Sequence, residues 1–306
     1  MENNNIVTCE GISKRYGNHL ALNGFSMNVN KGDIYGFVGE NGSGKTTVIR
    51  ILTGLTHKSS GSYSLFGVKD TDKNIVNVRK RVGAIVETPS IYPNMTLKDN
   101  MKMAGLIYGN TDTNEHLRVL SLVGLDSIYN DKRKVTNFSL GMRQRLGIAF
   151  SLLSNPELIL LDEPMNGLDP EGIVDIRNLI LRLNEEKGIT FIISSHILSE
   201  LSLVANKYGI ISHGVMLKEI TKDELTASLK PELVINLDNI ELAYSLLSGE
   251  YEVIKFNKGV KIIGEYKLNE ILKLLQDNNI NIENVIKVEG DIEKYYLSLI
   301  GGHNNA

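Results

Sequence analysis

The sequence has almost no cysteine and no apolar stretch long enough to cross a membrane. A single cysteine among 306 residues, Cys9, excludes an internal disulfide, and its place in an apolar segment predicts that it packs in a core. No run approaches the roughly 20 apolar residues that a membrane-spanning helix needs. Residues 1–5 lack the basic and apolar regions of a signal peptide. We therefore expect a cytoplasmic protein.

The sequence also lacks the excess of positive charge that proteins use to hold nucleic acids. Its formal net charge is −3, and this charge is unevenly distributed. Residues 221–306 contain 9 lysines, no arginine and 14 acidic residues, which gives this segment a net charge of −5. An acidic segment repels the phosphate backbone of DNA or RNA. We therefore expect no nucleic-acid partner.

One glycine-rich segment has the composition and the surroundings of a phosphate-binding loop. It consists of Gly39, Glu40, Asn41, Gly42, Ser43, Gly44, Lys45 and Thr46, and Thr47 follows it. A buried strand is predicted at 33–38 and a helix at 47–52. Together they aim backbone N–H groups and the positive end of a helix dipole at one spot, which suits a polyphosphate. In this pattern Lys45 reaches the β- and γ-phosphates and the Thr46 hydroxyl binds Mg²⁺. The chain is therefore predicted to bind a nucleotide.

A second segment combines four aliphatic residues, 158–161, with two carboxylates, Asp162 and Glu163. The aliphatic run predicts a buried strand that ends at the acids. Beside a phosphate-binding loop, Asp162 would hold Mg²⁺ through water, and Glu163 would act as the general base that polarises the attacking water.

The chain is predicted to have two domains. Residues 1–220 alternate strand and helix patterns, which indicates an α/β domain with a mostly parallel sheet and an antiparallel flank. Residues 92–153 are helical in pattern and predict a helical subdomain. Residues 221–306 predict a small α+β domain, in which segments beginning at Ile240 and Leu268 each place their apolar residues on one helix face.

The segment Asn137-Phe138-Ser139-Leu140-Gly141-Met142 opens a helix 23 residues before Asp162. Here the chain resembles the ATP-binding cassette of ABC transporters, a P-loop NTPase fold, and the resemblance covers roughly residues 5–218. The segment is similar to that family's signature motif, with Leu140 at the place of its first glycine. The resemblance implies that Ser139 and Gly141 contact the nucleotide of the opposite subunit in an ATP-bound homodimer.

Three further residues match the cassette in order along the chain. Asp169, in Asn166-Gly167-Leu168-Asp169, resembles the loop that crosses the dimer interface and contacts the nucleotide. His196 resembles the switch histidine of the catalytic site, and Tyr16 the aromatic residue that stacks on adenine. The other histidines match no motif and are expected to be solvated: His19, His57, His116, His213 and His303.

One position departs from the cassette pattern. The family carries a glutamine between its core and helical subdomains, near Mg²⁺, and this chain carries Glu87 there. A carboxylate is a good ligand for a hard cation, so Glu87 is predicted to bind the metal. Glu87 together with the segment 138–142 resembles the cassettes of bacitracin-resistance and lantibiotic-immunity exporters.

The resemblance implies a Mg²⁺-dependent ATPase that drives an exporter for an antimicrobial peptide or drug. Membrane permease chains would be its partners, and it would be peripheral on the cytoplasmic face of the membrane, with membrane contact only through the permease. One alternative is a soluble ATPase that acts on ribosomes or DNA, although this chain carries one cassette and no coiled coil. A second alternative is a regulatory switch that binds ATP without turnover.

Overall fold

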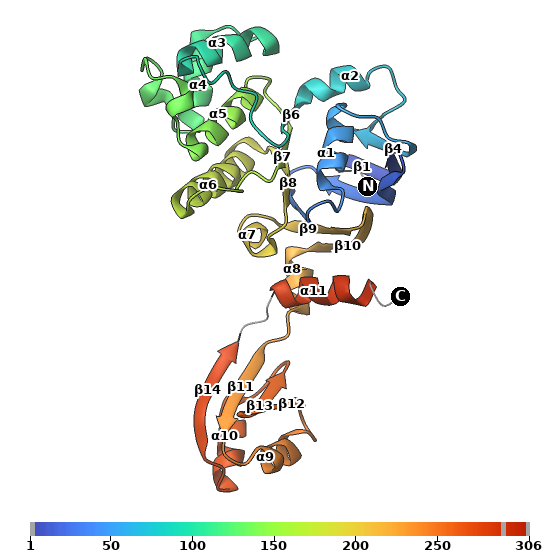
Figure 1. Cartoon of the computed structure of the whole chain (residues 1–306), viewed down its shortest axis with the longest axis vertical. Coiled ribbons are helices and arrows are strands. Elements are labelled where there is room, and N and C mark those ends of the chain that lie inside the picture. The colour runs from blue at the N-terminus through green and yellow to red at the C-terminus, as the bar shows by residue number, and fades with distance from the viewer. Residues whose placement is uncertain (1–3, 289–291, 304–306) are drawn as a thin grey trace. The chain divides into compact units, whose positions relative to one another are not determined.

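The structure is a computed structural model that describes residues 4–288 and 292–303. The chain divides into two compact units, Met1–Lys222 and Asp223–Ala306, and each is described by itself (Figure 1). Within the described residues, no helix is long and apolar enough to cross a membrane.

The centre of the first unit is a six-stranded sheet in the order β10-β9-β3-β8-β7-β6. Its strands are β3 (Ile34–Val38), β6 (Val82–Ile85), β7 (Leu158–Asp162), β8 (Thr190–Ser195), β9 (Lys207–Ser212) and β10 (Val215–Thr221). All neighbours pair in parallel except β10, which runs antiparallel to β9. Every residue of β3, β7 and β8 is buried, as expected for central strands covered on both faces. The predicted, mostly parallel core is confirmed.

An antiparallel sheet in the order β2-β1-β4-β5 forms the predicted flank. It consists of β1 (Asn5–Tyr16), β2 (His19–Asn30), β4 (Ser60–Leu65) and β5 (Val68–Lys69). Apolar side chains of β1 and β2 share one core cluster with residues of β3 and of the helix after it. Cys9 belongs to this cluster, and burial raises the pKa of its thiol, which fits the predicted packing role.

Helices surround the central sheet, and three of them, α3, α4 and α5, lie within residues 92–153. They are α1 (Lys45–Thr53), α2 (Ile75–Val78), α3 (Leu97–Tyr108), α4 (Thr113–Leu122), α5 (Leu140–Leu152), α6 (Pro170–Lys187) and α7 (Leu198–Ser202), with 3-10 turns at Arg79–Arg81, Asp126–Ile128 and Val135–Asn137. Side chains of Thr96, Asp112, Ser139 and Asp169 cap the N-termini of α3, α4, α5 and α6.

The prediction that the remaining histidines are solvated is wrong for one of them. His116 of α4 is buried, and its Nε2 lies 3.0 Å from the carbonyl oxygen of Asn110. The carbonyl oxygen of Asn110 is a hydrogen-bond partner for the buried His116 imidazole, and the hydrophobic periodicity of the sequence does not reveal such a partner. His19, His57 and His213 are exposed as predicted, and the side chain of His303 lies outside the described residues.

The second unit contains an antiparallel sheet in the order β12-β13-β11-β14. Its elements are α8 (Lys222–Ser228), β11 (Glu232–Leu237), α9 (Ile240–Leu247), β12 (Glu252–Phe256), β13 (Gly259–Ile263), α10 (Leu268–Asp277), β14 (Ile282–Val288) and α11 (Ile292–His303). Alternate residues of β11 and β13 pack with Ile271 and Leu275 of α10 in a separate core. The α+β class and the two amphipathic helices agree with the prediction, whereas α11 was not predicted.

Candidate functional site

The phosphate-binding loop runs from the end of β3 to the start of α1, and its glycines are there for steric reasons. A Cβ at Gly39 would lie 2.5 Å from the carbonyl oxygen of Ile211, and Gly44 has a φ of +112°. Other residues would clash at the first position and be strained at the second. Within the described residues, the buried hydroxyl of Ser43 has no hydrogen-bond partner. An orphaned donor inside such a loop fits an anionic ligand.

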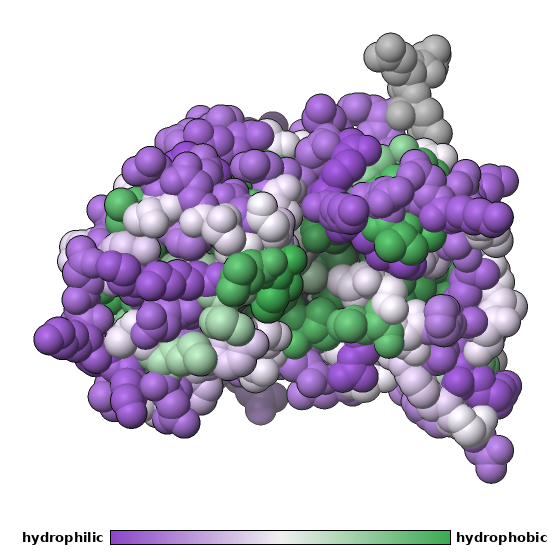
Figure 2. All heavy atoms as spheres, turned by 90° about the horizontal axis from the view of Figure 1, so that it is seen from above, coloured by the Kyte–Doolittle hydropathy of each residue, from purple (hydrophilic) through white to green (hydrophobic). Residues whose placement is uncertain are grey.

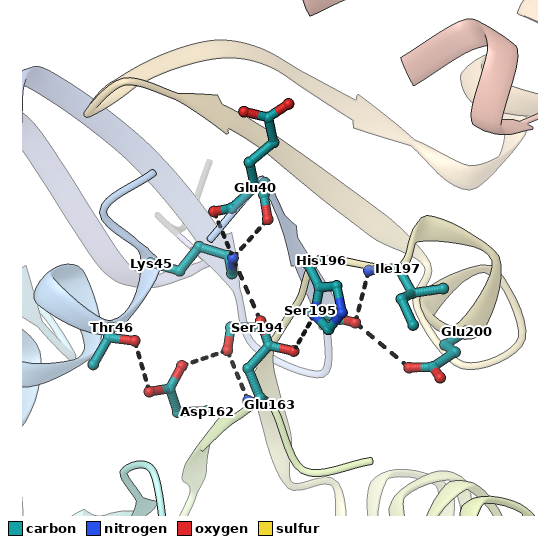
Figure 3. A network of polar contacts seen from close by, with 11 residues as sticks. Glu40, Lys45, Thr46, Asp162, Glu163, Ser194, Ser195, His196, Ile197 and Glu200 are labelled. Atoms are coloured by element: carbon teal, nitrogen blue, oxygen red, sulfur yellow. Dashed lines mark hydrogen bonds and ion pairs between the residues drawn. The ribbon is translucent and has the colours of Figure 1, made fainter. Parts of the chain in front are cut away.

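Lys45, the first residue of α1, points back into the loop that precedes it. Its side chain is only 5% exposed, and its Nζ donates to the carbonyl oxygens of Gly39 at 2.6 Å and Glu40 at 3.1 Å. Nζ also lies 3.4 Å from Oε1 of Glu163. Figure 3 shows the Glu40 carboxylate pointing away from this group, so Glu40 contributes its backbone and not its charge.

Thr46 and Asp162 are joined directly. The Thr46 hydroxyl donates to Oδ2 of Asp162 at 2.8 Å, and the Ser194 hydroxyl donates to Oδ1 at 2.6 Å (Figure 3). The second bond follows from the sheet, because Asp162 at the end of β7 is in register with Ser194 of β8. Ser194 was not predicted from the sequence, although a serine at the end of an apolar strand is a usable signal.

Glu163 follows β7 in a left-handed conformation, with φ +49°. Its N–H bonds to the hydroxyl of Ser194 at 2.9 Å, which holds the backbone in this turn. The carboxylate lies between two cationic or basic groups: Oε1 faces Lys45, and Oε2 is 2.9 Å from Nδ1 of His196 (Figure 3). The structure thus brings together Lys45, Glu163 and His196, which the sequence analysis grouped from three distant segments.

A cavity of about 260 Å³ opens beside these groups. It is lined by Tyr16, His19, Ala21, Asn41, Gly42, Gly44, Lys45, Thr46, Thr47 and Glu163. Tyr16 is 42% exposed at the end of β1, and the ammonium of Lys14 lies 4.6 Å from its ring centroid. An exposed aromatic face at the rim of a polar cavity can stack on a base. His19 also lines the cavity, which the sequence analysis did not anticipate.

The three residues predicted to contact a nucleotide across a dimer do not line this cavity. The Ser139 hydroxyl accepts from the N–H of Met142 at 3.1 Å and begins α5. Asp169 accepts from the N–H of Gly172 at 3.0 Å and begins α6. A Cβ at Gly141 would be 3.8 Å from Gly172, so the two helix starts are adjacent. They form a second surface, apart from the cavity.

In the described part of the chain, no hydrogen bond or ion pair joins Glu87 to Thr46 or Asp162. Glu87 has a φ of +63°, and its side chain is 60% exposed. Its Oε1 instead lies 2.5 Å from Nη2 of Arg50, a residue of α1 that the sequence analysis did not single out. The role of Glu87 as a metal ligand therefore stays a prediction.

The remaining oxygen groups suit Mg²⁺ only together with a nucleotide. The described residues contain no group of three or more His, Cys, Asp or Glu side chains that could hold a metal ion by themselves. Thr46 and Asp162 offer a hydroxyl and a carboxylate side by side. Mg²⁺ is typically bound by one or two such groups and by phosphate oxygens of the substrate, so this pair fits that ion.

Comparisons with known proteins agree with this geometry. The family model described as "ABC transporter" matches residues 22–166. The chain is 39% identical over 302 residues to the bacitracin transport ATP-binding protein BcrA of Bacillus licheniformis, covering 97% of this chain and 98% of that protein. It is 43% identical over 214 residues to the lantibiotic transport ATP-binding protein SrtF of Streptococcus pyogenes, covering 70% of this chain and 90% of SrtF.

A solved structure supports the same assignment. The ADP conformation of MJ1267, an ATP-binding cassette of an ABC transporter, is 28% identical with a TM-score of 0.64, over 72% of this chain and 92% of MJ1267. This likeness covers much of the chain, and the likeness to BcrA extends over nearly all of it. The phosphate loop, the paired carboxylates and the relatives thus lead to one conclusion: the chain belongs to the ATP-binding subunits of ABC transporters and is an ATPase of that family.

Proposed function

We propose that the group around Lys45 hydrolyses ATP with Mg²⁺ and powers an exporter. The observation that carries this proposal is the Glu163 carboxylate, held between Lys45 and His196 at the wall of the cavity. Lys45 and the loop N–H groups bind and orient the phosphates, and Tyr16 stacks on the base. Glu163 accepts a proton from the attacking water, and His196 orients Glu163. Thr46 and Asp162 would hold Mg²⁺, which would supply positive charge against the phosphates.

The site is proposed to be completed by a second copy of the chain. Ser139, Gly141 and Asp169 lie at the adjacent starts of α5 and α6 and outside the cavity of their own chain. A head-to-tail homodimer would place these helix starts over the phosphates bound by Lys45 of the partner. Their N–H groups would then complete the anion site from the opposite side.

This proposal is tested by the association state of Glu163→Gln protein. Removing the base should stop turnover and leave the phosphate contacts intact, so Mg·ATP should convert the variant into a persistent dimer, measured by light scattering. Wild-type protein should dimerise only transiently, and Lys45→Ala should remain monomeric because it cannot hold the phosphates. A variant that binds Mg·ATP and stays monomeric at all concentrations would refute the shared site.

A groove beside the helical segment is the proposed docking surface for a permease. It has a volume of about 760 Å³ and is lined by residues of α2, α3 and the turn after α2. Val76, Leu106 and Ile107 are 63%, 66% and 69% exposed at its wall. Hydrophobic side chains gather around a hollow on this face (Figure 2). Such a patch on a soluble unit typically marks a partner surface.

An apolar cytoplasmic helix of a permease chain is the occupant that we propose. The neighbouring Arg79 and Lys80 add positive charge to the groove, so acidic residues on that helix would complement it. This partner would place the chain at the cytoplasmic face of the membrane, with membrane contact only through the permease. Membership of the transporter family supports both points.

The exported molecule is proposed to be a peptide antibiotic. The full-length likeness to a bacitracin transport protein, together with the likeness to a lantibiotic transport protein, supports this class. A host strain that lacks this chain should become more sensitive to bacitracin or to a lantibiotic. Wild-type protein should restore resistance and Glu163→Gln should not. Unchanged sensitivity to both antibiotics would refute the substrate class and leave the ATPase assignment intact.

A further inference from the structure

The ion pair between Arg50 and Glu87 has no assigned role in the site described above. The atoms Nη2 and Oε1 are 2.5 Å apart, and the side chains are 39% and 60% exposed. Glu87 makes this contact from a left-handed backbone, φ +63°, which is uncommon for a residue with a side chain. A carboxylate in an unusual conformation is therefore held by a guanidinium from another element.

Glu87 follows strand β6, whose neighbour in the sheet, β7, ends at Asp162. Strand β6 pairs in parallel with β7, and Ile85 is in register with Leu161. The two residues after Ile85 therefore leave the sheet at the edge where Asp162 and Glu163 lie. Since neighbouring strands are about 4.8 Å apart, a glutamate side chain that leaves Arg50 can turn toward this edge.

Arg50 belongs to the helix that begins with Lys45 and Thr46, so the pair ties Glu87 to the nucleotide-binding helix. On its other side, Glu87 follows Val86, which lines a cavity of about 320 Å³ together with Thr53 and Leu55. Arg79 and Tyr108 line both this cavity and the proposed docking groove. The ion pair thus joins the nucleotide-binding helix to the segment after β6, one residue from a cavity that shares lining residues with the groove.

We propose that Arg50 is a positioning residue that controls the Glu87 carboxylate. Paired with Arg50, Glu87 is neutralised and adds no negative charge beside Asp162 and Glu163. Released from Arg50, the carboxylate turns toward the metal side of the site, where it repels bare phosphates and favours Mg²⁺. Movement of the segment after β6 by a partner in the groove would release it. This inference rests on the proposed function.

The test is the dependence of nucleotide binding on Mg²⁺, measured with a fluorescent non-hydrolysable ATP analogue. The quantity compared is the Kd in EDTA divided by the Kd in Mg²⁺, which cancels general losses of affinity. Arg50→Met should raise this ratio about two- to fivefold, the range expected for an exposed ion pair. Arg50→Lys keeps the charge on α1 and should return the ratio close to that of wild type.

The same substitution in a Glu87→Gln background separates this role from a general effect of charge. There Arg50→Met should leave the ratio unchanged, because no carboxylate remains to be released. Arg81→Met is the matched control: Arg81 forms an exposed ion pair with Glu157 at 2.6 Å and does not line the nucleotide cavity. It should not change the ratio.

Two results would overturn the inference. An equal rise in both backgrounds would mean that Arg50 acts on the phosphates directly, and an unchanged ratio in Arg50→Met would mean that the pair does not control Glu87. Failure of the proposed function looks different: wild-type protein would then not hydrolyse Mg·ATP, whatever the ratio in the Arg50 variants.

Discussion

Replacing Ser194 by alanine should damage both the stability and the activity of the first unit. The side chain is fully buried, and its hydroxyl bridges two residues of the site. It donates to Asp162 at 2.6 Å and accepts from the N–H of Glu163 at 2.9 Å. The Glu163 N–H retains a second acceptor, the Ser194 carbonyl oxygen at 3.2 Å. The turn after β7 should therefore survive, while Asp162 loses a donor.

The expected loss can be estimated from the type of bond removed. A hydrogen bond to a charged group contributes about 1.5–3 kcal/mol to the free energy of unfolding, and a neutral one about 0.5–1.5 kcal/mol. Of the hydrogen bonds that the Asp162 carboxylate makes in the described part of the chain, the one from Thr46 would remain, so the carboxylate would be poorly oriented for Mg²⁺. If about half of the lost energy is expressed in the transition state, kcat should fall roughly tenfold. Urea denaturation and steady-state ATPase rates measure the two effects.

Ser151→Ala is the matched control for this prediction. Ser151 is also buried, and its hydroxyl donates to a neutral carbonyl oxygen, that of Ile148, at 2.8 Å. Apart from the effect of local repacking, Ser151→Ala should lower the free energy of unfolding by about 1 kcal/mol or less, and it should leave kcat unchanged. Equal losses of stability in the two variants, with no change of kcat in Ser194→Ala, would refute the claim that Ser194 orients Asp162.

Two further variants test the loop and the groove. Gly39→Ala places a Cβ 2.5 Å from a backbone oxygen. It should lower ATP affinity at least tenfold and the free energy of unfolding by about 1–3 kcal/mol. The control is Gly249→Ala, whose Cβ would have no atom within 4 Å and which should change neither quantity. Leu106→Asp should abolish copurification with the permease and leave ATP binding unchanged. The control is Leu203→Asp, because Leu203 is also an exposed leucine, at 56%, but lies outside the groove; this variant should change neither copurification nor ATP binding. ATP affinity in Gly39→Ala like that of wild type, or retained permease in Leu106→Asp, would contradict these assignments.

The parts that the sequence predicted well depend on local patterns. The strand, glycine loop and helix around Lys45 are contiguous, and the short aliphatic run before Asp162 is typical of a buried strand in an α/β fold. The amphipathic helices of the second unit follow from an apolar face repeated every three or four residues. Family resemblance supplied His196 and Tyr16, which no local pattern distinguishes.

The features of the site that the sequence did not predict depend on pairing between distant segments. Ser194 becomes a partner of Asp162 only because β7 and β8 are in register, 32 residues apart along the chain. Arg50 meets Glu87 only because α1 runs beside the end of β6, and an arginine on a half-exposed helix face carries no signal of its own. The burial of His116 likewise depends on one carbonyl oxygen, that of Asn110.

The contacts of Lys45 suggest how binding of phosphate prepares the base. An ammonium has three N–H donors, and here two of them reach the carbonyl oxygens of Gly39 and Glu40 while Nζ also faces Glu163. A phosphate that binds Lys45 must compete with these partners. The Glu163 carboxylate, on a side chain that is 22% exposed, is the partner that can move, since the carbonyls belong to the loop. Binding would therefore release Oε1 toward the cavity while His196 keeps Oε2. The oxygen released in this way is the one that we propose accepts a proton from water.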